Sequence, residues 1–195
     1  MKKICLLLIF VLSVSLMFAC SKNQDSGLAE ESYKIEIEIE NYGTITAVLD
    51  AKTAPITVEN FINNVKSGFY NGLTFHRIIK GFMMQGGDQN GDGINNEGTP
   101  TIKGEFAYNG VENNISHTRG TLSMARSADY DSASTQFFIM HEDYTSLDNQ
   151  YAAFGRVVKG IEVVDAICNN SITEDNNGTV LERNRPVIKE IRIVE

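Results

Sequence analysis

The feature that most constrains this chain is residues 75–88, where one obligate cation lies among large apolar side chains and two consecutive glycines follow. Residues 74–79 are mostly β-branched or aromatic, which predicts a short strand. Alternation along that strand would place its odd-numbered positions, Arg77 among them, on one face. Gly86 and Gly87 escape the usual φ restrictions and predict a turn after the segment. A guanidinium in apolar surroundings is costly without partners, so Arg77 requires either a buried ion pair or a ligand, and the spacing favours neither.

A second strong pattern lies further towards the N-terminus, where residues 34–40 alternate strictly between charged and apolar side chains. Such alternation predicts a half-buried strand. A turn at residues 41–43 leads into residues 44–49, so the two segments predict a β-hairpin. Further strands are predicted at residues 121–125, 136–140, 151–158 and 187–194.

Two segments have helical rather than strand periodicity. The first is opened by Thr53-Ala54-Pro55 and runs to about Lys66, with its apolar side chains on one face. The second covers residues 160–167. Many strands with two helices far apart in the sequence predict a mainly β fold and are compatible with a closed antiparallel barrel capped by the helices.

Length and charge limit the classes of function. A chain of 195 residues indicates one domain, or one domain with an appendage, and is long enough for a sizeable core. The net charge is −8, and no cluster of lysine or arginine forms a basic stripe. Because phosphate groups are bound mainly by basic side chains, the sequence argues against nucleic acid as a partner.

Residues 1–19 have the architecture of a secretory signal: a basic start, an apolar run shorter than the about 20 residues of a membrane span, and an abrupt polar boundary. The residues before Cys20 resemble a bacterial lipobox, which implies that Cys20 becomes the lipidated first residue. We therefore expect export and a lipid anchor in a bacterial membrane of the cell envelope. Residues 20–32 would be a flexible tether and residues 33–195 the folded domain. The alternative is ordinary cleavage near Ala19 and release as a soluble protein.

The remaining candidates for covalent or metal chemistry are few. Once the cysteines of the signal and the proposed anchor are set aside, Cys168 alone remains, so no intramolecular disulfide is expected. Residues 88–93 match the first six positions of a calcium-binding loop, but the bidentate acid at the twelfth position is missing, and a solvated turn is the preferred interpretation. His117 and His141 lack metal-ligand spacing. We therefore expect no metal and no cofactor.

Three blocks of the sequence, in this order, resemble the cyclophilin family of peptidyl-prolyl isomerases. The blocks are residues 75–88, residues 120–126 with 134–139, and Leu147-Asp148 followed by residues 154–160. The resemblance extends from about residue 33 to residue 195. It implies a closed antiparallel eight-stranded barrel capped by two helices. It also implies an enzyme that accelerates rotation about X-Pro peptide bonds, with proline-containing polypeptides as its partners.

The same resemblance assigns side chains to a site. It implies that Arg77 stabilises the twisted peptide bond and that Gln85 contacts the substrate and holds the arginine. An apolar slot for the proline ring is implied at Phe82, Met83, Phe138 and Leu147. A groove for the flanking peptide backbone is implied at Ala125, Arg126 and Gln136, with Tyr151 as a further substrate contact.

Three positions depart from the common pattern of the family. Ser146 stands where many eukaryotic members carry tryptophan, so a large contact for the drug cyclosporin is missing. Arg126 replaces a common asparagine and Tyr151 replaces the usual histidine, and both changes should alter peptide preference. Arg77 and Gln85 are present, so the activity itself is still expected.

Three functions compete at this point. The first is a membrane-tethered prolyl isomerase that assists the folding of exported proteins. The second is a chaperone or scaffold that binds proline segments in the same groove without significant turnover. The third is an adhesin or partner-binding lipoprotein, which would use the exterior. Arg77 favours the first, because a pure binder does not need it, and we expect the protein to act as a monomer.

Overall fold

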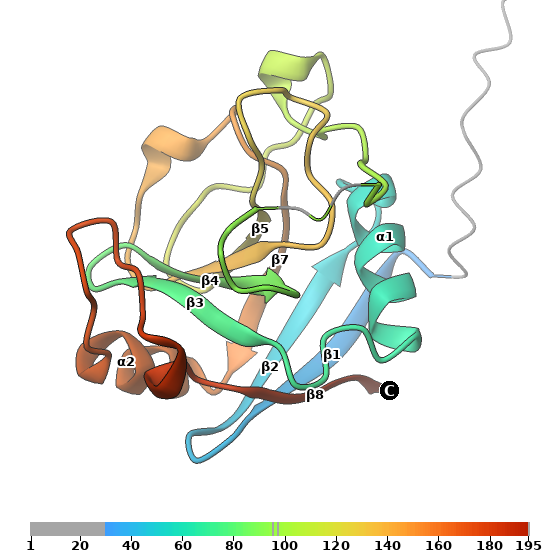
Figure 1. Ribbon diagram of the computed structural model, residues 1–195. Helices are drawn as coiled ribbons and strands as arrows, with labels where there is room; N and C mark the ends of the chain where they lie inside the picture. Colours follow the sequence, from blue (N-terminus) through green and yellow to red (C-terminus); the bar gives the residue numbers. More distant parts are fainter. Residues whose placement is uncertain (1–29, 95, 97, 195) are drawn as a thin grey trace, which may run out of the picture.

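The computed structural model describes residues 30–94, 96 and 98–194, which form eight β-strands, two α-helices and three short 3-10 helices (Figure 1). The strands are β1 (Ser32–Ile39), β2 (Gly43–Asp50), β3 (Thr74–Ile79), β4 (Met83–Asp88), β5 (Thr121–Met124), β6 (Phe137–Met140), β7 (Ala153–Lys159) and β8 (Ile188–Val194). The helices are α1 (Pro55–Lys66), α2 (Ile161–Asn170), η1 (Ala107–Asn109), η2 (Thr145–Leu147) and η3 (Glu182–Asn184). Residues 1–19, Cys20 and most of the predicted tether lie outside the described residues.

All strands pair antiparallel in one sheet, in the order β3-β4-β6-β5-β7-β2-β1-β8. The mainly β prediction is confirmed, but the predicted closure of the barrel is wrong: the sheet is a curled half-barrel that stays open between β3 and β8. The outer edge of β3 is occupied instead by the segment before β8. Arg77 pairs with Thr179 in an isolated bridge, and the N–H of Ile78 donates to the carbonyl of Gly178. The start of β3 meets the chain that enters β8: Thr74 forms an isolated bridge with Val187, and the N–H of Phe75 donates to the carbonyl of Pro186 at 3.0 Å.

A β-bulge in β3 changes which side chains share a face with Arg77. Phe75 pairs with Gly86 and Arg77 pairs with Gln85, so two positions of β3 oppose one step of β4. The predicted simple alternation is therefore wrong for this strand. Phe75 turns into the main core, whereas Arg77 lies beside the side chain of Gln85.

Gly86 and Gly87 lie inside β4, and the predicted turn at this pair is wrong. Both positions exclude a side chain because other backbone passes close to them. A Cβ at Gly86 would lie 2.8 Å from the carbonyl oxygen of Thr74, and one at Gly87 would lie 2.6 Å from that of Thr135. The two glycines let other backbone segments approach β4 closely, which is a common reason for glycine inside a strand.

The apolar side chains form two separate clusters on the two faces of the sheet. The larger cluster is the main core and holds the rings of Phe61, Tyr70, Phe137 and Phe154, whose centroids lie 5.0–5.5 Å apart in the contacting pairs. Helix α1 packs against β2 and β8, and α2 packs against β2 and β4. The smaller cluster is centred on buried Met83, Phe138 and Met140. Neighbouring residues on β6 thus serve opposite faces, as strand alternation requires.

Residues 88–93 form the turn that follows β4. Both carboxylate oxygens of Asp88 accept backbone N–H groups, one from Asn90 at 3.3 Å and the other from Gly93 at 2.7 Å. Within the part of the chain that the structure describes, no group of three or more histidine, cysteine or acidic side chains is placed to hold a metal ion. The same residues contain no helix that is long and apolar enough to span a membrane.

Cys168 lies near the end of α2 and is 3% exposed. Burial, with the nearby Asp165 carboxylate, raises the pKa of its thiol to about 12, so the thiolate is disfavoured. Cys168 therefore packs as a small buried hydrophobic side chain.

Candidate active site

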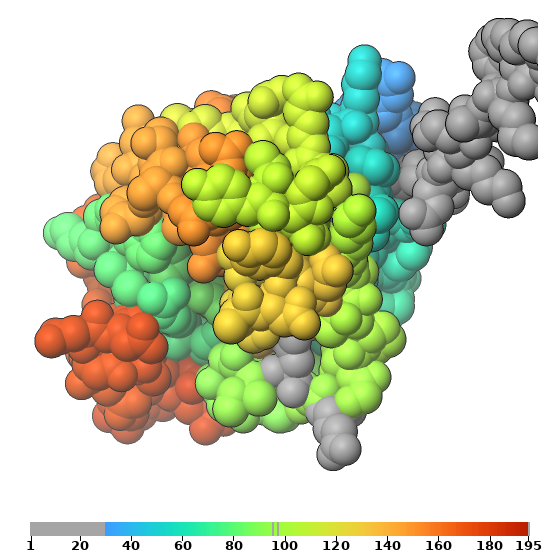
Figure 2. All heavy atoms as spheres, turned by 90° about the horizontal axis from the view of Figure 1, so that it is seen from above, coloured from blue at the N-terminus to red at the C-terminus, as the bar shows by residue number. Residues whose placement is uncertain are grey.

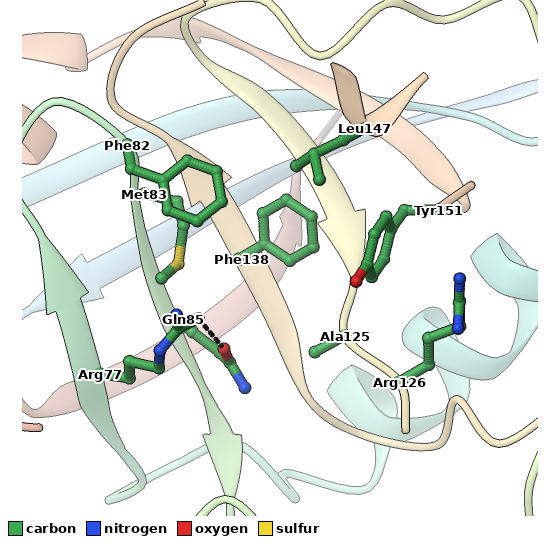
Figure 3. A pocket seen from close by; sticks show the side chains of 9 residues that line it. All are labelled: Arg77, Phe82, Met83, Gln85, Ala125, Arg126, Phe138, Leu147 and Tyr151. Carbon is green, nitrogen blue, oxygen red and sulfur yellow. Dashed lines mark hydrogen bonds between the residues drawn. The ribbon is translucent and has the colours of Figure 1, made fainter. Parts of the chain in front are cut away.

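A pocket on the outer face of the sheet is lined by nine side chains that come from five different parts of the fold (Figure 3). They are Arg77 on β3, Phe82, Met83 and Gln85 at and on β4, Ala125 and Arg126 after β5, Phe138 on β6, and Leu147 at the end of η2 with Tyr151 before β7. Every predicted site residue of the folded domain except Gln136 is in this set. Gln136 lines an adjoining pocket together with Gln85, Ala125 and Arg126. The structure thus brings the predicted residues together, while their roles stay predictions.

Arg77 is held by neutral partners. Its Nε–H donates to the carbonyl oxygen of Asn177 at 2.8 Å, and its Nη1 donates to Oε1 of Gln85 at 3.2 Å. The amide nitrogen of Gln85 donates in turn to Oε1 of Gln136 at 3.0 Å. Burial lowers the pKa of Arg77, because desolvation penalises the charged form, but a guanidinium stays protonated at neutral pH.

None of the ion pairs among the described residues includes Arg77. Of the two interpretations left open by the sequence, the buried ion pair is therefore wrong for the described part of the chain. The remaining interpretation is a ligand. The guanidinium points along the mouth of the pocket, where Figure 3 shows it beside Gln85 and opposite the aromatic side chains.

The apolar part of the pocket is formed by Phe82, Met83, Phe138 and Leu147. Met83 is 1% exposed and Phe138 is 5% exposed, so packing against neighbouring side chains holds both in place. The ring of Phe138 meets Tyr151 edge to face, with centroids 6.0 Å apart. A slot of this kind, flat-walled and mostly apolar, suits a small aliphatic ring, and the polar groups of Arg77 and Gln85 lie at its side.

Behind Phe138 lies a hydrogen-bonded chain that sequence reasoning missed. Nδ1 of His117 lies 2.9 Å from a carboxylate oxygen of Asp148, and Nε2 lies 2.9 Å from the hydroxyl of Ser123. Because the carboxylate can only accept, Nδ1 carries the proton and Ser123 donates to Nε2. The imidazole stacks on Phe138 with an interplanar angle of 21°. The nearest sequence signal was that Asp148 directly follows a pocket residue.

This Asp148–His117–Ser123 chain has the connectivity of an acyl-transfer triad, but its placement excludes that chemistry. Ser123 and His117 are both 0% exposed, so no substrate carbonyl can reach the hydroxyl. Burial opposes ionisation of Asp148, yet hydrogen bonds from Ser116 and His117 outweigh it and lower the pKa of the carboxyl. Burial also lowers the pKa of His117, which is therefore neutral near pH 7. The chain fixes the floor of the pocket.

The neutral state of His117 predicts a stability change with pH. Its folded pKa lies below the ordinary value of 6.5, so below that pH the unfolded chain takes up a proton that the folded state resists. We expect the free energy of unfolding to be highest above about pH 6.5 and to fall as the pH drops towards the folded pKa. Urea unfolding at pH 7.5 and pH 5.5 measures this.

The matched variant for that measurement is His117→Gln, which cannot titrate and should show a smaller loss between the two pH values. Burial also lowers the pKa of His76, so His76 contributes its own part of the stability loss at low pH. That part should remain in His117→Gln and should be missing in His76→Gln. An undiminished pH dependence in His117→Gln would contradict the assignment.

Tyr144 is a second residue that the sequence did not single out. It lies just before η2, is 47% exposed, and its ring centroid lies 4.7 Å from that of Phe82. Ser146 is exposed on η2 and offers no large side chain at this rim. Tyr144 therefore extends the apolar wall of the slot outward, on the side where the sequence indicated a missing aromatic contact.

The fold is shared with solved structures. The cyclophilin type peptidyl-prolyl cis-trans isomerase of Cryptosporidium parvum superposes with a TM-score of 0.73 at 28% identity, over 84% of this chain and 98% of that chain. The same protein, solved in the presence of the dipeptide Ala-Pro, gives a TM-score of 0.72 at 29% identity, over 83% and 99% of the two chains. The fold is therefore that of the cyclophilins.

The sequence comparisons agree with the structural ones. Peptidyl-prolyl cis-trans isomerase A of Dickeya dadantii is 46% identical over 130 residues, covering 64% of this chain and 66% of that protein. The peptidyl-prolyl cis-trans isomerase of Acinetobacter baylyi is 43% identical over 134 residues, covering 66% of this chain and 69% of that protein. The family described as "Cyclophilin type peptidyl-prolyl cis-trans isomerase/CLD" matches residues 34–195, so the chain belongs to this family of isomerases, which act on proline-containing polypeptides.

Proposed function

We propose that the pocket accelerates cis-trans rotation about X-Pro bonds, with the proline ring in the slot beside Phe138 and the guanidinium of Arg77 as the donor. The observation that carries this proposal is the state of Arg77. It is anchored by Asn177 and Gln85, it has no carboxylate partner among the described residues, and it lies at the side of an apolar slot.

The reaction makes and breaks no covalent bond. Amide resonance imposes a barrier of about 18–20 kcal/mol on rotation, and any donor that engages the prolyl nitrogen lone pair weakens that resonance. Such a donor binds the twisted state better than either planar state, which is the differential binding that catalysis requires. The bonds to Asn177 and Gln85 hold the guanidinium in place before the substrate arrives. The slot fixes the ring while the preceding residue turns.

A direct test is isomerisation of a short X-Pro peptide by the purified protein, followed by NMR exchange. Acceleration over the uncatalysed rate is expected. A folded protein that binds the peptide without accelerating exchange would instead support the alternative function, a proline-binding chaperone or scaffold without significant turnover.

The rim formed by Tyr144 predicts a change in binding rather than in chemistry. Tyr144→Ser removes an apolar wall that contacts Phe82 but no group near Arg77, so we expect KM to rise about three- to tenfold with little change in kcat. Tyr108→Ser is the matched control, because Tyr108 is 63% exposed on η1 and, among the described residues, makes no ring contact like that of Tyr144 with Phe82. Equal kinetics for the two variants would contradict the assignment of Tyr144 to the rim.

We further propose that the protein is exported, is anchored to a bacterial membrane through a lipid on Cys20, and assists the folding of exported proteins as a monomer. The sequence of residues 1–20 supports the anchor. Radiolabelled fatty acid should label the full chain, and Cys20→Ser should lose the label and leave the membrane fraction. A protein that is unlabelled and released after cleavage near Ala19 would refute the anchor without touching the isomerase proposal. Sedimentation of the released form tests the monomer.

A further inference from the structure

The pocket and its adjoining pocket are lined by positive charge, whereas the chain as a whole is negative. The chain carries 25 acidic and 17 basic side chains. Yet among the described residues that line the two pockets, Arg77 and Arg126 are charged and no acidic side chain is present. The two pockets share Gln85, Ala125 and Arg126, so they form one continuous groove. Figure 2 shows the segment after β5, which carries Arg126, beside the segment after β4, which carries Ile94.

Arg126 is held rigidly but not neutralised. Its guanidinium carbon lies 4.6 Å from the ring centroid of Tyr151, 4.9 Å from that of Tyr130 and 5.2 Å from that of Phe106. Its Nε–H and Nη2 donate to the carbonyl oxygen of Gln150 at 3.1 and 2.8 Å, and Nη1 donates to its neighbour's carbonyl at 2.9 Å. Rings and carbonyls orient a guanidinium without cancelling its charge.

Two other arginines of the fold, unlike Arg126, are paired with carboxylates. Arg119 makes a bidentate pair with Asp165, with distances of 2.6 and 2.7 Å. Arg192 lies 2.6 Å from Glu36 and also contacts two further glutamates. No ion pair of Arg126 exists among the described residues. Bonds to the described residues use three of its five N–H donors, so two remain for a ligand as far as that part of the chain is concerned.

We propose that Arg126 makes this groove select proline-containing segments that carry an aspartate or glutamate side chain within about three residues of the proline, since Arg126 lines the same pocket as the proposed proline slot and an extended chain advances about 3.3–3.6 Å per residue. A carboxylate can accept hydrogen bonds from the remaining donors of the guanidinium. Because the surrounding rings already hold the Arg126 side chain in place, it loses less conformational entropy on binding than a free arginine would. The inference rests on the proposed function, because it assumes that the proline occupies the slot.

The test is a matched set of X-Pro peptides in which glutamate or glutamine stands at each of the three positions before and after the proline. For the wild-type protein we expect one position at which glutamate raises kcat/KM over glutamine by about three- to tenfold at low salt. That preference should shrink at 0.5 M salt, because screening weakens a half-exposed ion pair. Arg126→Gln should bring the ratio close to one, and Arg126→Lys, which keeps the charge without the fork, should retain part of it.

Arg183→Gln is the matched control, because it removes the same charge from an exposed position on η3 that lines neither pocket. It should keep the wild-type ratio. A wild-type ratio near one at every position, or an unchanged ratio in folded Arg126→Gln, would overturn the inference while leaving isomerisation intact. If no peptide is turned over, the proposed function fails instead, and the affinities for the glutamate and glutamine peptides, measured by fluorescence anisotropy, still decide the selectivity.

Discussion

Replacing Arg77 by alanine is expected to lower kcat/KM for an X-Pro peptide by about 10²–10³-fold, the usual loss when one preorganised donor to a transition state is removed. The effect should lie in kcat, because the apolar slot that binds the ring is untouched. Arg77→Lys keeps the charge but cannot reach Asn177 and Gln85 with a planar fork, so an intermediate loss is expected. Exchange NMR under saturating and subsaturating peptide separates kcat from KM.

The control for this prediction is Arg183→Ala, which removes an exposed arginine away from both pockets and should leave the kinetics unchanged. Circular dichroism shows whether the Arg77 variant is folded. Full acceleration by a folded Arg77→Ala protein would show that the donor is another group. Intact peptide binding with lost acceleration would separate the enzyme from a proline-binding scaffold.

The second large effect is expected for Gly87→Ala, which should destabilise the fold by about 2–5 kcal/mol, because it adds the cost of a collision to that of a left-handed alanine. Gly87 has φ of +83°, and a Cβ there would lie 2.6 Å from the carbonyl oxygen of Thr135 and 3.1 Å from the rings of Tyr70 and Phe137. The backbone of β4 or of the segment before β6 must shift to make room, and both carry pocket residues. Urea unfolding measures the loss, and kcat/KM should fall with it.

Gly81→Ala is the matched control, because Gly81 has φ of +80° and nothing within 4 Å of the added Cβ. It keeps the cost of placing alanine in the left-handed region, about 1–2 kcal/mol, without the collision. The difference between the two variants therefore measures the close approach of backbone at Gly87. Equal losses would show that the strained φ alone accounts for both.

Much of the local structure could be predicted from side-chain periodicity. The alternation of residues 34–40 and the apolar stripe that ends at Lys66 depend only on neighbours along the chain, and the structure has β1 and α1 there. The candidate residues could also be named in advance, because family motifs preserve their spacing. Phe138 shows the limit of this reasoning: beside Phe137 in an apolar strand it reads equally well as core, and only its place on the outer face puts it in the pocket.

The sequence by itself determined seven of the eight strands and the two helices, because these follow from local periodicity, and motif spacing named the candidate site residues. Strand β4 was missed, because Gly86 and Gly87 indicated a turn. Only the tertiary structure decided how the sheet ends and what surrounds the site. The segment around Thr179 occupies the edge of β3 and keeps the half-barrel open, and a bulge brings Arg77 opposite Gln85. The bond between His117 and Asp148 and the contacts of Arg126 with Phe106 and Tyr151 join residues far apart in sequence. Such contacts depend on how distant segments pack together, which no local pattern records.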